Sequence, residues 1–304
     1  MKQFLKKIII AAASVGMLAN AGLVAHAVDT QWDKPTVIYG AGLSEAEKKE
    51  TAVQLGMDKQ EVLESVVTGK DLEKYLGYAT ADANMISSVA VKRTGKGGGV
   101  TVNIATPKNI TLITKEQYMN AAFTAGIENA DIQVAAIRPV TGESALTGVY
   151  KAFEENGEHL ESNRMAVAQE ELETTSDIAQ TLDKDQAKRL DAAIVEIKQQ
   201  LADLKKRTDE LATREDIEKI INDALDEYDL SSILTEEQMN RLIALFEKYQ
   251  QTSAIDSDKI KEQLGNLKDK LGKVWKEAEE SGVIDRIVQF LRDIWNAIMD
   301  AFHN

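Results

Sequence analysis

The chain has no cysteine and few prolines, histidines and aromatic residues. Its 304 residues include three prolines and three histidines, and aromatic residues make up 5%. Without cysteine there is no thiolate catalysis, iron–sulfur cluster, cysteine zinc site or disulfide, so buried apolar side chains must hold the fold together. A hydrophobic fraction of 43% and a charged fraction of 28% are typical of a globular protein.

The N-terminal segment has the three parts of a secretory signal peptide. Basic residues come first, then a short apolar run, then a small-x-small cleavage pattern: Lys2, Lys6, Lys7, residues 8–18, Ala25 and Ala27. An uncleaved membrane anchor is the alternative, but the apolar run is short and Asn20 follows it. We therefore expect residues 1–27 to be removed and the protein to be secreted, extracellular or held noncovalently at the cell envelope.

Basic charge is scarce in the chain that export would leave. Cleavage after Ala27 removes three lysines and no acid, which takes the formal net charge from −14 to −17. DNA, RNA and anionic lipid all require a basic surface. We therefore expect no nucleic-acid partner.

A change of composition near residue 157 divides the chain. All three prolines and thirteen of the sixteen glycines outside the signal peptide lie at or before Gly157, so turn residues become rare beyond it. We expect an α/β module over residues 28–158 and a helical region over residues 159–304, which together make an α+β protein.

The first part contains a weak internal duplication of residues 36–69 and 109–142. Each copy has a short β-branched strand, a helix with a capping box, a glycine stop, a second strand and a Val-Thr-Gly sequence. The capping boxes begin at Ser44 and Thr114, and the copies end at Gly69 and Gly142. This pattern predicts two β-α-β units, with right-handed crossovers if their strands are parallel.

Between the copies the sequence predicts a central hairpin. Residues 87–93 and 100–104 are strand-like, and the glycine-rich segment 95–99 separates them. The hairpin would extend the sheet formed by the two β-α-β units, giving a mixed sheet of about six strands.

The second part is predicted to be almost wholly helical, as a helical hairpin or bundle. Apolar residues recur at alternating spacings of three and four over residues 190–211 and 260–278, which is typical of coiled coils. Shorter stripes mark helices over 217–225 and 242–246, and Thr235 with Gln238 caps the latter.

The last helix carries the widest apolar stripe. Its residues are Ile284, Ile287, Leu291, Ile294, Trp295, Ile298 and Phe302. Membrane-surface helices usually have a basic polar face, whereas this helix has only two arginines against three aspartates. Packing against the other helices, self-association with another copy, or an envelope partner is therefore favoured over membrane-surface contact.

No assembled catalytic, cofactor or metal site stands out, and we expect none. His159 and His303 are isolated, there is no Gly-x-Ser-x-Gly elbow, and the sequence Asp256-Ser257-Asp258 lacks the remaining ligands of a calcium loop. The glycines at 40–42 fit a turn better than a phosphate cradle. Those at 95–99, flanked by Lys92, Arg93 and Lys96, fit equally well a mobile basic tip for an acidic polymer or a flexible exposed turn. A carboxylate pair for hydrolysing wall polymers stays possible, because sequence spacing does not report the distance between carboxyl groups.

Three segments resemble the YpuA-like family of secreted Gram-positive proteins, a family of unknown function. They are residues 39–44, Asn109-Ile110-Thr111 and, above all, the sequence Val-Thr-Gly-Glu-Ser-Ala-Leu-Thr-Gly of residues 140–148. The resemblance covers the signal peptide, the α/β part and, more loosely, the helical part with residues 170–175. It implies export and transfers no catalytic or binding residue. The protein is expected to be a non-enzymatic binding or structural module.

Overall fold

The computed structural model describes residues 32–95 and 97–280, and its N-terminal part is built on one mixed sheet. The sheet has five strands in the order β2-β1-β3-β5-β4. The strands are β1 (Thr36–Gly40), β2 (Leu63–Val67), β3 (Ser88–Arg93), β4 (Val100–Ile104) and β5 (Ala130–Ala135). Strand β3 is antiparallel to both its neighbours, whereas β1–β2 and β4–β5 are parallel pairs. The predicted α+β class and mixed sheet are confirmed.

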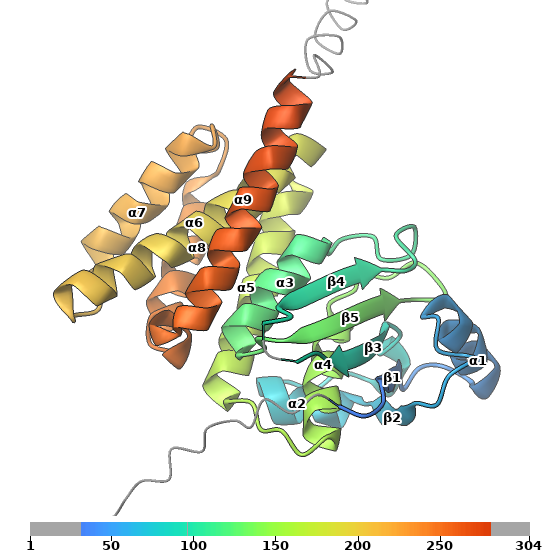
Figure 1. Ribbon diagram of the computed structural model, residues 1–304. Coiled ribbons are helices and arrows are strands. Elements are labelled where there is room, and N and C mark those ends of the chain that lie inside the picture. The colour runs from blue at the N-terminus through green and yellow to red at the C-terminus, as the bar shows by residue number, and fades with distance from the viewer. Residues whose placement is uncertain (1–31, 96, 281–304) are drawn as a thin grey trace, which may run out of the picture.

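Helices cover the two faces of this sheet unequally. They are α1 (Glu45–Gln54), α2 (Gly69–Leu76), α3 (Lys115–Ala125) and α4 (Ser144–Glu155). Residues of α2, α3 and α4 share one apolar core with one face of the strands, and a smaller core under α1 covers part of the other face. In Figure 1, α1 lies at one end of the sheet and no helix crosses the front of β4 and β5.

Local sequence explains where these helices begin and end. The capping boxes predicted at Ser44 and Thr114 are both present, with each side chain accepting a hydrogen bond from the third residue of its helix. Helix α3 ends at Gly126, whose φ of 97° is in the left-handed region. The predicted starts and stops of α1 and α3 are therefore confirmed.

The predicted central hairpin is wrong, although both of its strands exist. Strands β3 and β4 do not pair with each other, because β5 lies between them and pairs with both. A two-residue turn would force the strands to be neighbours, whereas the segment 94–99 is long enough to cross the end of β5, which requires two strand spacings or about 9.6 Å.

The predicted first strand of the second copy, residues 110–113, is also not formed as a strand. Ile110 makes only an isolated parallel bridge with Val140. The β-α-β unit of this copy instead uses β4, α3 and β5, and β4 is the parallel partner of β5. Both β-branched segments place apolar side chains in the same core, Val100 and Val102 from one and Ile110 and Ile113 from the other, but only residues 100–104 pair along β5.

The second part consists of long helices, as predicted. They are α5 (Ser162–Gln180), α6 (Lys184–Thr208), α7 (Arg214–Glu227), α8 (Glu236–Tyr249) and α9 (Asp258–Glu280). Residues of α5, α6, α7 and α8 form a second apolar core, while Ile260, Leu264 and Leu267 of α9 return to the first one. Figure 1 shows α5 and α9 between the sheet and the pair α7 and α8.

Helix α5 has no apolar stripe that the sequence analysis could detect. Many of its buried side chains are polar, namely Arg164, Gln169, Glu171, Thr174, Thr175 and Ser176. A helix whose buried face is polar gives no 3.6-residue hydrophobic period. Its buried polar side chains find their partners on α3 and α6. Arg164 donates to the carbonyls of Thr124 and Phe123 at the end of α3, and Glu171 pairs with Lys198 of α6.

Two predictions fall outside the described residues, and a third is not tested. The cleavage site at Ala25 and Ala27 and the apolar helix over 284–302 lie in segments that the structure does not describe. The domain boundary near residue 158 stays a prediction. None of the described helices combines the length and the apolar character needed to cross a bilayer.

Candidate functional site: a polar cavity at the carboxyl edge of the sheet

The direction of the strands brings both Val-Thr-Gly sequences to one edge of the sheet. Strands β1, β2, β4 and β5 run the same way, so their carboxyl ends share an edge with the start of β3. Residues 67–69 lead from β2 into α2, and residues 140–142 lie between β5 and α4. In open α/β sheets this edge is the usual place for a ligand.

A cavity of about 230 Å³ lies at this edge. Its lining comes from α2 and the segment after it, the start of β3, the loop between β5 and α4, and α5. The lining residues are Leu72, Tyr78, Thr80, Asn84, Met85, Ser87, Val140, Thr141, Gly142, Glu143, Ser144 and Gln169. They include hydroxyl and amide groups and no lysine, arginine or histidine.

One amide in the lining has an unused acceptor. Gln169 is only 3% exposed, and its Nε2 donates to Glu173 Oε1 at 2.9 Å. The Tyr78 hydroxyl donates to the same carboxylate oxygen at 2.5 Å. Gln169 Oε1 is buried and has no hydrogen-bond partner among the described residues. An unpaired buried acceptor is costly, because it has lost its water without a replacement.

Glu143 brings a carboxyl group to the lining. It occupies the N-cap position of α4, but its side chain makes no capping hydrogen bond. Burial is the main cause that raises the pKa of Glu143, and the charges of Glu173 and Asp177 raise it further. The Thr141 hydroxyl, which donates to Glu143 at 3.4 Å, opposes this shift. Negative charge is therefore unfavourable here unless something positive approaches it.

The conformation of the loop before α4 explains the glycine of its Val-Thr-Gly sequence. Gly142 has a φ of 106°, which L side chains rarely adopt. Its carbonyl accepts a hydrogen bond from the buried Tyr118 hydroxyl at 2.6 Å. The loop that carries Thr141, Glu143 and Ser144 is thereby fixed to α3.

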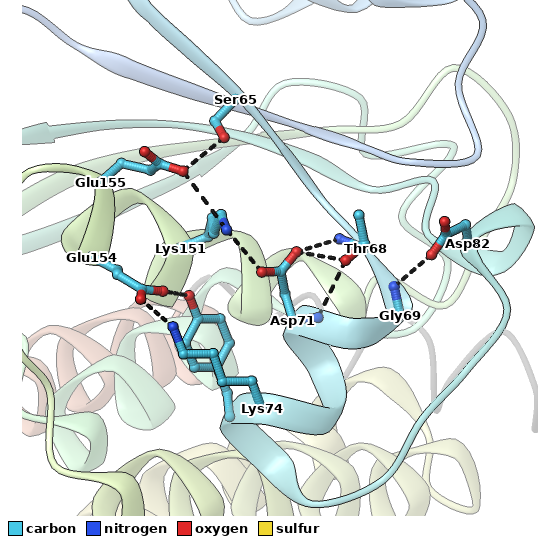
Figure 2. Close-up of polar contacts among 10 residues, drawn as sticks. Ser65, Thr68, Gly69, Asp71, Lys74, Asp82, Lys151, Glu154 and Glu155 are labelled. Atoms are coloured by element: carbon cyan, nitrogen blue, oxygen red, sulfur yellow. Dashed lines mark hydrogen bonds and ion pairs between the residues drawn. The ribbon is translucent and has the colours of Figure 1, made fainter.

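A network of charges fixes α2 against α4 (Figure 2). Lys151 of α4 pairs with Asp71 of α2 at 2.8 Å and lies 3.7 Å from Glu155, which also accepts from Ser65 of β2. Burial alone would raise the pKa of Asp71, but hydrogen bonds from Lys151 and Thr68 outweigh it and lower the pKa. Every charge in this network has a partner, so the network has a structural role. It holds α2 and α4, which contribute to two walls of the cavity, in a fixed relative position.

Glu154 makes a second link between the same two helices. Its carboxylate accepts from Lys74 and from the hydroxyl of Tyr75, both of α2. The tyrosine ring packs edge-on against the ring of Tyr150 in α4. Apolar packing and ion pairing therefore act together at this contact.

Gly69 lets the segment after α2 approach the start of that helix. A Cβ at this position would lie 1.8 Å from the Thr80 carbonyl oxygen, and the Gly69 N–H donates to Asp82 Oδ1 at 2.8 Å. Helix propensity alone predicts that Gly69→Ala stabilises the protein by about 1 kcal/mol. We expect it instead to destabilise the protein by about 2 kcal/mol, because backbone must move.

The exposed neighbour provides the control for this prediction. In urea unfolding followed by circular dichroism, Lys70→Ala should change the free energy of unfolding by less than about 0.5 kcal/mol. A stabilised Gly69→Ala variant would show that the close approach to Thr80 does not exist.

In the two glycine-rich segments, the amides of Ala41, Gly42, Gly97 and Gly99 are already hydrogen-bonded. Gly97 and Gly99 both donate to Asn129 Oδ1, at 3.1 and 3.2 Å, and Val100 donates to Gln263 Oε1 at 3.1 Å. Ala41 and Gly42 donate to the carbonyls of Val67 and Met85 at 3.0 and 2.9 Å. Both segments are thus built as turns, which is the interpretation favoured from the sequence for residues 40–42 and one of the two left open for residues 95–99. A second cavity of about 270 Å³ beside residues 97–99 and α9 shows no buried polar atom without a partner among its described lining residues.

The other residues weighed in the sequence analysis do not gather at the cavity. His159 is exposed beyond α4, and Asp256-Ser257-Asp258 forms the junction between a 3₁₀ turn and the start of α9. Within residues 32–95 and 97–280, no three histidine, aspartate or glutamate side chains are placed to hold a metal ion. Glu143 and Gln169 line the cavity although neither was predicted as a site residue. The available signal was the repeated Val-Thr-Gly sequence, which leads directly into Glu143.

Comparison with known proteins agrees with the resemblance seen in the sequence. Residues 39–267 match the family described as protein of unknown function (DUF1002). The chain is 33% identical over 298 residues to a Bacillus subtilis protein whose printed name is "Uncharacterized protein YpuA", and the match covers 95% of this chain and 98% of that protein. No solved structure matches the fold. The chain belongs to the YpuA-like family of proteins of unknown function.

Proposed function

We propose that this protein is exported and acts as a non-enzymatic binding module of the cell envelope, with the polar cavity at the carboxyl edge of the sheet as its ligand site. One observation carries the proposal. Gln169 lines a cavity rich in hydroxyl groups, and its buried Oε1 has no hydrogen-bond partner among the described residues. A ligand that donates to this oxygen would remove the cost of leaving it unpaired.

The N-terminal sequence supports export. Three lysines, a short apolar run and the Ala25-x-Ala27 pattern together fit a cleaved signal. If the full chain is expressed in a Gram-positive host, the protein recovered outside the cell should begin at Val28. Recovery of the intact chain from the cytoplasm would argue against export.

Binding is favoured over hydrolysis by the placement of the acids. Glycoside hydrolases need two carboxyl groups that both face the reacting bond. Here Glu143 lines the cavity, whereas the Glu173 carboxylate accepts hydrogen bonds from Tyr78 and Gln169, and Glu173 is not itself a lining residue. Release of soluble sugar or peptide from cell walls, abolished by Glu143→Gln, would favour the hydrolase alternative and overturn the binding proposal.

The binding proposal is tested by cosedimentation with isolated cell envelopes. We expect the exported protein to pellet with envelopes and Gln169→Leu to bind about tenfold more weakly, because it removes the acceptor and puts an apolar side chain of similar size in its place. Gln60→Leu makes the same chemical change at an exposed position after α1 and should bind as the unaltered protein does. Failure of the unaltered protein to pellet, or equal binding by all three proteins with unchanged melting temperatures, would contradict the proposal.

A further inference from the structure

We infer that the group held in the cavity at the carboxyl edge is a primary ammonium of the ligand. The inference rests on the proposed binding function and specifies its chemistry. It follows from the free acceptor, from the charge around the cavity and from the character of its walls.

The free acceptor requires a donor from the ligand. The hydrogen bond from Gln169 Nε2 to Glu173 fixes which end of the amide is which, because a carboxylate accepts and cannot donate when ionised. The unpaired atom is therefore the carbonyl oxygen, Gln169 Oε1. A ligand carbonyl, ether or carboxylate cannot satisfy it, whereas an ammonium, amide N–H or hydroxyl can.

The charge around the cavity selects a cation among these donors. Neither Glu143 nor Glu173 forms an ion pair with a basic residue in the part of the chain that the structure describes, and the lining itself has no basic side chain. Asp177, which also raises the pKa of Glu143, is already paired with Arg241 at 2.8 Å. An anionic ligand would add repulsion, and a neutral one would leave Glu143 uncompensated. A cationic ligand avoids the repulsion and also compensates the charge of Glu143.

The walls and the donor count favour an ammonium over other cations. An ammonium is compact and carries three donors, which can be shared among Gln169 Oε1, the Glu143 carboxylate and a hydroxyl such as that of Ser144. Leu72, Met85 and Val140 give apolar contact for the methylene groups that carry the ammonium. A bare metal ion fits poorly, since the described residues bring no three acidic or histidine ligands together.

The probe that tests this inference is pentylamine, measured against its uncharged and anionic counterparts. By isothermal titration calorimetry at pH 8, we expect pentylamine to bind the exported protein at least tenfold more tightly than 1-pentanol, and pentanoate not to bind. Equal binding of pentanol, or any preference for pentanoate, would overturn the inference without the need for a variant.

A matched pair of variants locates the binding. Glu143→Gln removes the charge and should weaken pentylamine binding about tenfold, while Glu50→Gln removes the same charge from exposed α1 and should leave it unchanged. Binding by the unaltered protein should also weaken as the pH is lowered, because protonation of Glu143 removes its charge. The titratable groups around Glu143 are Glu173 and Asp177 of α5, Tyr78 after α2 and Tyr118 of α3.

Competition separates this inference from the proposed function. Pentylamine, and not pentanol, should displace the protein from envelopes, which would place the amine on an envelope component. If envelopes bind in a Gln169-dependent way and pentylamine neither binds nor competes, the ammonium inference is wrong and the binding function stands. If envelopes do not bind at all, the proposed function itself fails.

Discussion

Replacing Lys198 by methionine should lower the free energy of unfolding by about 3–5 kcal/mol, the largest effect that we expect from any single substitution. Lys198 of α6 is 1% exposed, and its ammonium pairs with Glu171 of α5, which is 2% exposed. It also donates to the Asn120 carbonyl at 3.1 Å and to Thr124 Oγ1 at 2.9 Å. Methionine has an unbranched side chain only one atom shorter than that of lysine, and it leaves the Glu171 charge buried without its partner.

The size of this effect comes from desolvation. Burial lowers the pKa of Lys198, and Glu171 only partly restores it. A charged carboxylate left alone in the interior would cost more than the pair contributes when it is intact. The network also includes Arg164, whose guanidinium donates to the carbonyls of Thr124 and Phe123 at the end of α3, at 2.7 and 2.9 Å. It therefore joins α5 and α6 to the α/β part.

Two controls make this prediction specific. Lys248→Met breaks the exposed ion pair with Glu170 and should cost less than about 1 kcal/mol in urea unfolding. Removing both buried charges, with Lys198→Met and Glu171→Leu together, should restore much of the stability lost in the single variant. Equal losses for Lys198→Met and Lys248→Met would show that the buried pair does not exist in solution.

Asp191→Asn should remove a strong pH dependence of stability. Asp191 of α6 is 2% exposed and accepts a hydrogen bond from Thr114 Oγ1 at 3.1 Å. Burial raises the pKa of Asp191 from its ordinary value of 3.8 to about 8, with a smaller contribution from the charge of Glu116. Between these two pH values the folded protein holds a proton that the unfolded chain has released.

The direction of the pH dependence of stability follows from the proton that Asp191 keeps in the folded state. The Asp191 contribution to stability is fully present below pH 3.8 and is lost as the pH rises towards 8, because the folded state binds more protons than the unfolded state. Asparagine does not titrate, so its advantage over aspartate should grow by roughly 3 kcal/mol between pH 5 and pH 8. Urea unfolding of both proteins at the two pH values measures this difference. Parallel curves would mean that Asp191 is ionised in the folded protein.

Local features of the fold could be predicted from the sequence. The capping boxes at Ser44, Thr114 and Thr235 and the glycine stop at Gly126 are set by interactions within four residues. Such interactions form in nearly any tertiary context. Pairing of strands is different, since β5 entered between β3 and β4 and a pattern of alternating residues does not say which strand is its neighbour.

The candidate site could be predicted only in part from the sequence. The Val-Thr-Gly sequence before α4 was recognised as a repeat, and it lies at the cavity. Gln169 could not be recognised, because a glutamine on a polar helix has no distinguishing pattern until α5 is packed against the α/β part. Its unpaired oxygen is a property of the assembled structure alone.

The sequence by itself determined the composition limits, the helix ends, the mixed α/β and helical character and the family of this protein. Each of these depends on residue types or on neighbours close in the chain. Only the tertiary structure decided the strand order, the elements against which α5 packs, the burial of the ionisable groups of Lys198, Glu171 and Asp191, and the cavity. These depend on segments far apart in sequence, and the free energy of burying a charge or an amide is set by the groups that surround it after folding.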